Sequence, residues 1–517
     1  MEKKNKSATV TVLFMILAMI ISKLLGMFRG VLLAASYGTT ESATAFSAAS
    51  RIPLSFFDIV FASAILGCFI PVYNSFSGND KKREQNDFAA IYLNFLLLLT
   101  GIVTLLGIVF AKPLVTMVAP GLLPETHRLA VLLLRLMFPI VILAAASYTF
   151  VGVLQSNGEY IIPSFISAVS NLLIIVYFLF FDGLFGIKGL AIAYSVAWCV
   201  QLITMIVPII KVGYRHRLLF NFRSPSFITA LKLTPPIIMG SWLSPVCLLL
   251  SMRFATYTET QGAIPSFEYA INLFTVITGI TTYGVCNYIF PKLSLQANGS
   301  EGEFAKTGRE GLLSALLMTV PIAAIVMALA PEGVSIVYLR GSFDADSARN
   351  VALILRTLVP GMLGFTLVEF LSRTFYAMKK PKFVVISVIA GIVADLIMLA
   401  LLINAFSGDI EALGISYSVG ILVSGITMLI FAATNVKGFV DVSYIFSLIK
   451  MLLAGAVSVG VMMIIKNAVG NNAYENGFIF NAFFAVGVAI AGLVVYLLLL
   501  AVMYRKFNPI KNIGKKV

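Results

Sequence analysis

Apolar runs of about twenty residues recur throughout this chain of 517 residues. A helix of about 20 apolar residues can cross the hydrocarbon core of a bilayer, because its backbone satisfies its own hydrogen bonds there. Hydrophobic residues make up 59% of the chain and charged residues only 12%, which leaves too little polar surface for a water-soluble protein of this size. The runs therefore predict an all-α integral membrane protein.

About fourteen segments are long and apolar enough to be transmembrane helices. The first follows a basic N-terminus with no small-residue cleavage site after it, so we expect a retained helix and not a signal peptide. The predicted spans are 8–36, 43–75, 87–111, 128–154, 160–181, 187–211, 227–255, 265–294, 308–330, 347–377, 382–405, 411–434, 443–466 and 476–504.

Basic residues are distributed unequally between the two sets of connecting loops. An even number of spans places both termini on one side, and short loops rich in lysine and arginine stay in the cytoplasm. The basic set comprises the two termini and the loops near residues 81–83, 211–223, 306–309 and 379–382. The opposite loops contain Lys112, Arg128, Lys188, Arg340, Arg349 and Lys466. We therefore expect both termini to be cytoplasmic.

The chain also contains a weak internal repeat. Four short matches occur in the same order with an offset of about 220 residues: 69–71 with 289–291, 134–139 with 355–360, 163–165 with 381–383, and 190–196 with 413–419. The offset covers six helices, which gives two copies of parallel topology, an architecture in which transporters bind substrate between the halves. The repeat predicts lobes at 1–225 and 226–440, followed by two extra helices and a basic cytoplasmic tail at 441–517.

Three cations lie in the first two predicted helices: Lys23, Arg29 and Arg51. A cation in mid-membrane costs at least about 2.5–3.5 kcal/mol, so it usually faces a cavity or a partner. Gly26 lies between the first two and permits a bend or close packing, and Pro53 frees a backbone carbonyl beside Arg51. The pattern favours a binding site for phosphate or pyrophosphate, with arginine offering a bidentate donor and lysine a point charge.

An alternative for each of these side chains is that it extends to the nearest membrane interface. Arg253 ends the seventh segment and has the same two interpretations, a substrate-binding cation at the mouth of a cavity or a contact with outer lipid headgroups.

Two acids lie within apolar segments, Asp395 in the eleventh and Asp58 in the second. A carboxylate inside the membrane is a candidate for ion or proton coupling. The alternatives are a structural hydrogen bond for Asp395 and neutralisation of Arg51 by Asp58.

Other intramembrane charges favour structural roles. Glu369 and Arg373 are spaced i, i+4, which predicts an ion pair within one helix. Arg135 and Arg356 occupy equivalent positions of the repeat, and we expect them to connect helix ends.

Nothing in the sequence predicts an enzyme. It contains no GxxxxGK[ST] phosphate-binding loop, and no loop is long enough to fold into a catalytic domain. The four cysteines have no CxxC spacing and are expected to be small core residues, and no metal site is expected from the two isolated histidines.

Several motifs resemble those of the MurJ (MviN) lipid II flippase family, in the multidrug/oligosaccharidyl-lipid/polysaccharide transporter superfamily. Residues 22–29 are similar to its Ser-Arg-x-x-Gly-x-x-Arg motif. Further similarities are Ala45–Phe46, Ile52–Pro53 and 69–71 in the second helix, 134–139 in the fourth, and 372–377 with Pro381 in the tenth. The resemblance covers essentially the whole chain and implies fourteen helices in two lobes, with those beyond the twelfth forming a groove for a lipid tail.

The sequence departs from the family pattern at several charged positions. The first-helix arginine of the motif is Lys23 here, an aspartate is Thr44, and arginines of the second and eighth helices fall at Phe57 and Asn272. The family's Glu-Gly pair is replaced around Ala62–Ser63. Part of the family's charged cavity is therefore missing, which leaves the exact lipid-linked substrate open.

The resemblance implies a flippase that exports a polyprenyl-pyrophosphate-linked peptidoglycan precursor across the bacterial cytoplasmic membrane by alternating access. Its partners would be that precursor, membrane lipids and cell-wall synthesis proteins, with no nucleic acid. It needs no cofactor, and membrane potential, sodium or protons would drive it. The alternatives are a flippase for another lipid-linked oligosaccharide, a transporter of drug-like cations, which the positive cavity disfavours, and a non-transporting scaffold for wall synthesis.

Overall fold

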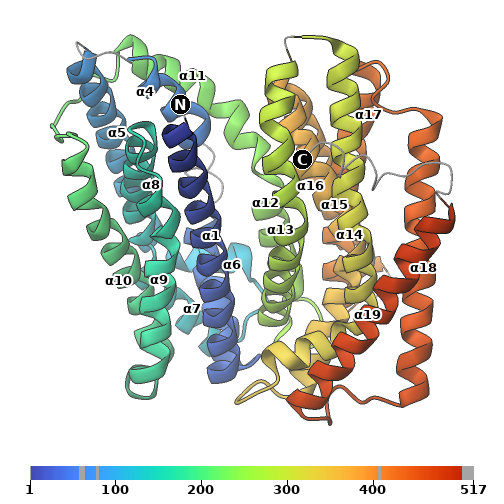
Figure 1. Cartoon of the computed structure of the whole chain (residues 1–517). Coiled ribbons are helices and arrows are strands. Elements are labelled where there is room, and N and C mark those ends of the chain that lie inside the picture. The colour runs from blue at the N-terminus through green and yellow to red at the C-terminus, as the bar shows by residue number, and fades with distance from the viewer. Residues whose placement is uncertain (1, 57–64, 77–80, 298, 406–408, 504–517) are drawn as a thin grey trace. The chain divides into compact units, whose positions relative to one another are not determined.

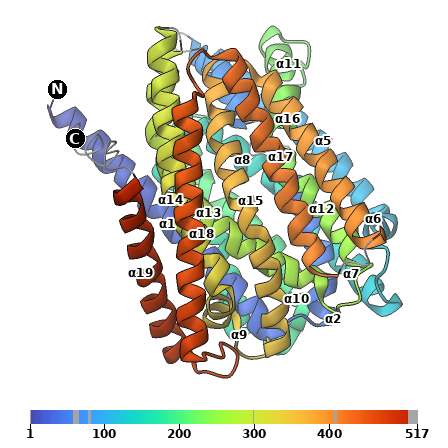
Figure 2. The same ribbon diagram turned by 90° about the vertical axis from the view of Figure 1, so that its right-hand side faces the viewer.

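The computed structural model describes residues 2–56, 65–76, 81–297, 299–405 and 409–503. All regular secondary structure in these ranges is helical. The long helices of each part of the chain run alongside one another (Figures 1 and 2). The fold class predicted from the apolar runs is therefore confirmed.

The chain divides into two compact units, at Met1–Glu268 and Tyr269–Val517, so that the division falls inside one helix, α13. This division by packing lies later in the chain than the boundary at 225 that the repeat predicts, and the lobes at 1–225, 226–440 and 441–517 stay a prediction.

The described residues of unit 1 form twelve helical elements and the start of α13. They are α1 (Glu2–Tyr37), α2 (Glu41–Phe56), η2 (Ile65–Phe69), α4 (Ile70–Asn74), α5 (Lys82–Val109), α6 (Ala111–Val118), α7 (Pro124–Met137), α8 (Ile140–Ser156), α9 (Ile161–Phe180), α10 (Asp182–Lys211), α11 (Pro225–Gly240), α12 (Leu243–Ala255) and α13 (Ala263–Gln296). The main packing partners are α1 with α9, α9 with α10, α2 with α7, and α5 with α8.

The part of unit 2 that the structure describes forms the rest of α13 and seven further elements. They are α14 (Glu301–Tyr338), α15 (Ala345–Ala377), α16 (Pro381–Ala400), η4 (Leu401–Ala405), α17 (Glu411–Asn435), α18 (Val442–Val469) and α19 (Phe478–Met503). Helices α15 and α17 pack most closely, because Gly364 has no side chain: a Cβ there would lie 2.7 Å from the backbone nitrogen of Leu422.

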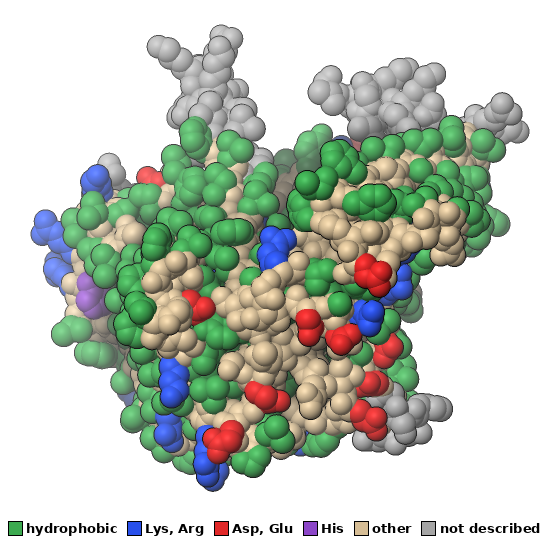
Figure 3. Space-filling model, turned by 90° about the horizontal axis from the view of Figure 1, so that it is seen from below, with side chains coloured by type: hydrophobic (Ala, Val, Ile, Leu, Met, Phe, Trp, Pro, Cys, Tyr) green, Lys and Arg blue, Asp and Glu red, His purple; other side chains and the backbone are tan. Residues whose placement is uncertain are grey.

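Twelve helices among the described residues are long and apolar enough to span a membrane. Many large hydrophobic side chains on them are exposed, including Leu184 at 75% and Ile464 at 69%. Figure 3 shows hydrophobic side chains over much of the end it views, with acidic and basic ones between them. Exposed apolar surface on this scale is expected where lipid is the solvent.

The seventh and second of the fourteen predicted spans need separate description. The seventh, 227–255, is the pair α11 and α12, bent by 51°. The bend lies beside Ser241, whose carbonyl would pair with the backbone nitrogen of residue 245, and that residue is a proline without an N–H group. The second, 43–75, includes residues 57–64, which lie outside the described ranges.

Polar contacts connect three helices of unit 1 near the end of α1 and the start of α10. The Tyr37 hydroxyl of α1 donates to the Asp182 carboxylate at the start of α10. The Tyr177 hydroxyl of α9 donates to the Gly186 carbonyl over 2.6 Å. Gly186 has φ of 57°, a left-handed conformation that favours glycine, and it lets α10 turn sharply onto α9.

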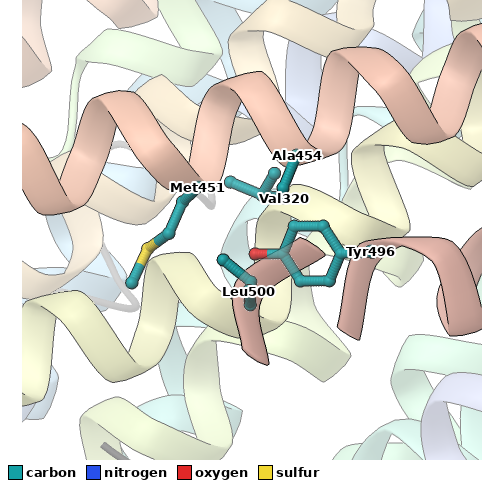
Figure 4. Packing of buried hydrophobic residues seen from close by; sticks show 5 residues of the cluster. All are labelled: Val320, Met451, Ala454, Tyr496 and Leu500. Carbon is teal, nitrogen blue, oxygen red and sulfur yellow. The ribbon is translucent and has the colours of Figure 1, made fainter. Parts of the chain in front are cut away.

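The two extra helices predicted at the C-terminus are present and pack on α14. Their contact includes a buried cluster of Val320 from α14, Met451 and Ala454 from α18, and Tyr496 and Leu500 from α19 (Figure 4). A second cluster, around Met462 and Val488, continues the contact along α14. The hairpin α18–α19 is therefore part of unit 2 and not a detached appendage.

Ion pairs connect α18 to α14 at both ends. Arg309 near the start of α14 pairs with Asp441, the N-cap residue of α18. At the other end, the Lys466 Nζ lies 2.7 Å from Glu332 Oε1, and the Glu332 side chain is fully buried. Asn471 Nδ2 donates to the same carboxylate over 3.0 Å. Lys466, which the sequence places in an outer loop, therefore contributes to packing.

Three of the charged residues for which the sequence predicts structural roles make the expected contacts. Arg373 Nη2 lies 3.4 Å from Glu369 Oε2, which confirms the predicted intrahelical pair. Arg135 Nε donates to the Ile108 carbonyl in the last turn of α5 over 3.2 Å, so it connects two helix ends as expected. Arg356 is partly buried.

The cysteines are all free, and three of the four are buried. Cys199 is exposed, so the prediction of a core position was wrong there. Its segment is apolar on all sides, and the sequence therefore does not distinguish its lipid-facing side from its packed side.

Replacing Glu332 with glutamine should destabilise unit 2, because the Lys466 side chain, which is 15% exposed, loses its fully buried charged partner. Breaking a buried ion pair from one side costs about 3–5 kcal/mol. We expect a clearly lower midpoint of thermal unfolding for the purified protein in detergent. The control is Asp346→Asn, since that carboxylate is 82% exposed in its pair with Arg349 and contributes about 1 kcal/mol or less. Equal shifts for the two variants would contradict this role.

Candidate functional site

Two neighbouring helices anchor the intramembrane cation Arg29 of unit 1. It lies on α1, and its Nη1 donates to Asn171 Oδ1 of α9 over 2.9 Å. Its guanidinium also lies 5.4 Å from the centre of the Tyr194 ring on α10, a cation–π arrangement. Two neighbouring helices thus fix the position of one charge that the sequence alone identified.

Gly26 makes this anchoring possible. A Cβ at Gly26 would lie 3.3 Å from Asn171 Nδ2, so any larger residue would crowd the amide that orients Arg29. The same Nδ2 donates to the Ser22 carbonyl over 3.2 Å. The Asn171 side chain therefore binds α1 through both its oxygen and its nitrogen. The close packing expected at Gly26 occurs against α9.

Arg51 and a glutamate that the sequence analysis did not single out complete the cluster. Glu268, on α13 but within unit 1, accepts a hydrogen bond from the Ser47 side chain of α2 and interacts electrostatically with Arg51 and Arg29. Ser47 and Arg51 are one helical turn apart on α2, before the buried Pro53. The cluster thus joins α1, α2, α9, α10 and the start of α13. We call Arg29, Arg51, Glu268, Ser47, Asn171 and Tyr194 the arginine cluster.

A signal for Glu268 was present in the sequence. It is the one acid in the predicted span 265–294, and an acid inside a span is a functional candidate. Asn171 and Tyr194 carried no comparable signal, because neutral polar and aromatic residues are frequent in such helices.

Lys23 is partly buried on α1, six residues before Arg29. At about 100° per residue, that spacing puts the two side chains about 120° apart around the helix. They therefore do not share one face of α1, and the role of Lys23 in substrate binding stays a prediction.

Arg253 lies in a different place. Its Nη1 donates to the Met117 carbonyl of α6 over 2.5 Å. It lines a surface pocket with Lys112, Pro113, Thr116, Met117 and Pro120, and none of the residues of the arginine cluster lines that pocket. Arg253 therefore lies apart from the arginine cluster, and its role in substrate binding stays a prediction.

The two candidates for ion coupling have different outcomes. Asp395 on α16 is fully buried, and a Cβ at Gly420 of α17 would lie 2.8 Å from its Cβ, so α17 packs directly against it. Asp58 lies outside the described residues. Within the described part of the chain, no group of three or more His, Cys, Asp or Glu side chains could hold a metal ion.

Comparison with known proteins gives one consistent result. The family model described as "Lipid II flippase MurJ" matches residues 33–485. A probable lipid II flippase MurJ from Buchnera aphidicola subsp. Acyrthosiphon pisum (strain APS) is 27% identical over 368 residues, covering 70% of this chain and 72% of that protein. A second, from Bdellovibrio bacteriovorus (strain ATCC 15356 / DSM 50701 / NCIMB 9529 / HD100), is 24% identical over 442 residues, covering 84% of each.

Solved structures show the same fold. One of a lipid II flippase MurJ in an inward closed conformation has a TM-score of 0.81 at 21% identity, and the match covers 96% of this chain and 99% of that one. An inward-facing multidrug resistance MATE family transporter of the MOP superfamily has a TM-score of 0.67 at 15% identity, with 81% and 95% covered.

Gly26 and Gly30 of α1 provide a matched pair for testing the arginine cluster. Glycine-to-alanine replacement within a helix usually stabilises it by about 0.5–1 kcal/mol. A Cβ at Gly30 would have nothing within 4 Å, whereas one at Gly26 would meet Asn171. We expect Gly30→Ala to unfold at the same or a higher temperature than the natural protein, and Gly26→Ala at a lower temperature than Gly30→Ala. A Gly26→Ala variant at least as stable as Gly30→Ala would contradict the packing described here.

Proposed function

This chain belongs to the lipid II flippase MurJ family, and we propose that it moves a polyprenyl-pyrophosphate-linked peptidoglycan precursor, lipid II, from the inner to the outer leaflet by alternating access. The observation that carries this proposal is the pair Arg29 and Arg51, positioned inside apolar helices of unit 1 by Asn171, Tyr194 and Glu268. Because a cation inside the membrane is costly, an intramembrane arginine is a candidate for function, and two of them favour an anionic ligand.

The chemistry of arginine fits a pyrophosphate. A guanidinium has five N–H donors in a plane, and the bond to Asn171 uses one of those of Arg29. Arg29 and Arg51, which both act on Glu268, together offer bidentate donors for the oxygens of two linked phosphates. The lipid tail would stay in the bilayer while the head group binds to the protein.

Transport in this proposal needs no chemistry on the substrate, so the protein acts as a transporter without an enzymatic step. It lies in the bacterial cytoplasmic membrane with both termini in the cytoplasm, as the basic loops indicate. Its partners are the lipid-linked precursor, membrane lipids and cell-wall synthesis proteins.

We propose that membrane potential, sodium or protons drive the return of the empty transporter, with no bound cofactor. A cavity with excess positive charge responds to voltage, since moving one charge across the membrane changes the free energy by about 2.3 kcal/mol per 100 mV. Asp395 is the candidate for an ion-coupling residue, because it is a fully buried acid in a span.

A second candidate is a flippase for another lipid-linked oligosaccharide. It is favoured by Thr44, Phe57 and Asn272, where the family pattern has charges. A non-transporting scaffold for wall synthesis is a third. Depletion separates them: lipid II should accumulate in the inner leaflet under the first proposal and stay unchanged under the other two.

Replacing Arg29 with alanine should reduce transport by at least about tenfold, because one bidentate phosphate donor is worth roughly 1.5–3 kcal/mol. The transport rate of Arg29→Lys should lie between those of the natural protein and Arg29→Ala, because lysine keeps the positive charge but lacks the planar set of donors. The measurement is translocation of lipid II in cells that lack their own flippase. The control is Arg135→Ala, because Arg135 is exposed and bound to a helix end. Unchanged transport by Arg29→Ala would rule out this pyrophosphate site.

Replacing Asp395 with asparagine tests the coupling proposal. The change keeps the size of a side chain that α17 packs against and removes its charge. Transport rates of the variant should no longer depend on the sodium or proton gradient, whichever drives the natural protein. A gradient dependence equal to that of the natural protein would exclude Asp395 as the coupling residue.

A further inference from the structure

The arginine cluster already contains an acidic side chain. Glu268 accepts a hydrogen bond from Ser47 and lies within the electrostatic reach of both Arg51 and Arg29. It also acts electrostatically on Tyr194, the ring over which Arg29 lies. The groups facing Glu268 are therefore Arg29 from α1, Ser47 and Arg51 from α2, and Tyr194 from α10.

This placement has a clear benefit for the empty site. Two guanidinium groups that act on the same side chain in a medium of low dielectric constant also repel each other, and each is costly to desolvate. A carboxylate that interacts with both arginines reduces these costs. Without it, the empty site would need to admit a soluble anion or to open to water.

The same carboxylate is a disadvantage when a pyrophosphate arrives. Arginine N–H groups and their field are what a phosphate ester needs, and a negatively charged neighbour opposes the binding of a second anion. Glu268 and the ligand therefore compete for the same two arginines.

We propose that Glu268 is the resident counter-ion of the arginine cluster: it offsets part of the positive charge of Arg29 and Arg51 in the empty transporter and gives both arginines up to the pyrophosphate of the substrate. This inference rests on the function proposed above and adds a specific residue to it. A bound Glu268 lowers the affinity of the site, and a transporter needs such a limit, because a site that binds too tightly does not release its substrate.

The test is the affinity of Glu268→Gln for a soluble disubstituted pyrophosphate. The probe is UDP-N-acetylglucosamine, which has the phosphate linkage without the lipid tail, titrated calorimetrically into the purified full-length protein in detergent. Glutamine keeps the shape and the hydrogen bond with Ser47 but removes the competing charge. We expect the variant to bind the probe roughly tenfold more tightly than the natural protein does. A factor of ten corresponds to a charge interaction strong enough to shift a pKa by one unit.

The control is Glu125→Gln, which removes a carboxylate that is 87% exposed in its pair with Arg128 and should leave the affinity unchanged. If the role of Glu268 is purely structural, Glu268→Gln should bind the probe more weakly than the natural protein, because the site loses a structural contact. Unchanged or weaker binding by a folded Glu268→Gln protein would therefore overturn the proposal.

Two further variants keep the result interpretable. If Glu268→Gln does not fold, Glu268→Asp retains the charge but withdraws it from the guanidinium groups, and its affinity should exceed that of the natural protein. Equal or lower affinity would contradict the proposal. Arg29→Ala tests the site itself: if it binds the probe as well as the natural protein, the proposed function fails. If Arg29→Ala weakens binding while Glu268→Gln does not tighten it, only the role of Glu268 fails.

Discussion

The energetic cost of a charge inside the membrane determines how this protein uses its few intramembrane ions. A cation there persists only with partners that replace water. Arg29 has three kinds of partner, the Asn171 amide, the Tyr194 ring and the Glu268 carboxylate. Each comes from a different helix, so the requirement to solvate one charge also fixes how α1, α9, α10 and the start of α13 pack. The geometry of the candidate site and the stability of unit 1 therefore depend on the same contacts.

Unit 2 also contains a buried charge, but there the charge is fully paired and stabilises helix packing. The buried Glu332 is paired with Lys466 and receives a hydrogen bond from Asn471. Because the charges of Glu332 and Lys466 balance each other, the pair connects α14 and α18 and leaves no excess charge for a ligand. The contrast separates two uses of buried charge: a matched pair stabilises packing, whereas an excess of cations, as at Arg29 and Arg51, is available to an anionic ligand.

Much of the fold was predictable from the sequence, because helix length and apolar composition are local properties. The two extra helices and the Glu369–Arg373 pair were predicted correctly for that reason. The cations at Arg29 and Arg51 could be identified, since charges are rare in such segments. Their surroundings could not: Glu268 is more than two hundred residues from either arginine in the chain, and no periodicity indicates which helices meet. The bend beside Ser241 and the exposure of Cys199 depend likewise on tertiary packing.

The central claim is that the arginine cluster binds the pyrophosphate of a lipid-linked precursor. The most direct test is an experimental structure of the full-length protein in a lipid nanodisc with that precursor bound. The account predicts pyrophosphate oxygens within hydrogen-bonding distance of Arg29 and Arg51, with the Glu268 carboxylate moved away from both. Pyrophosphate bound elsewhere, for example beside Lys112 and Arg253, with the contacts of Arg29 and Glu268 unchanged, would contradict it.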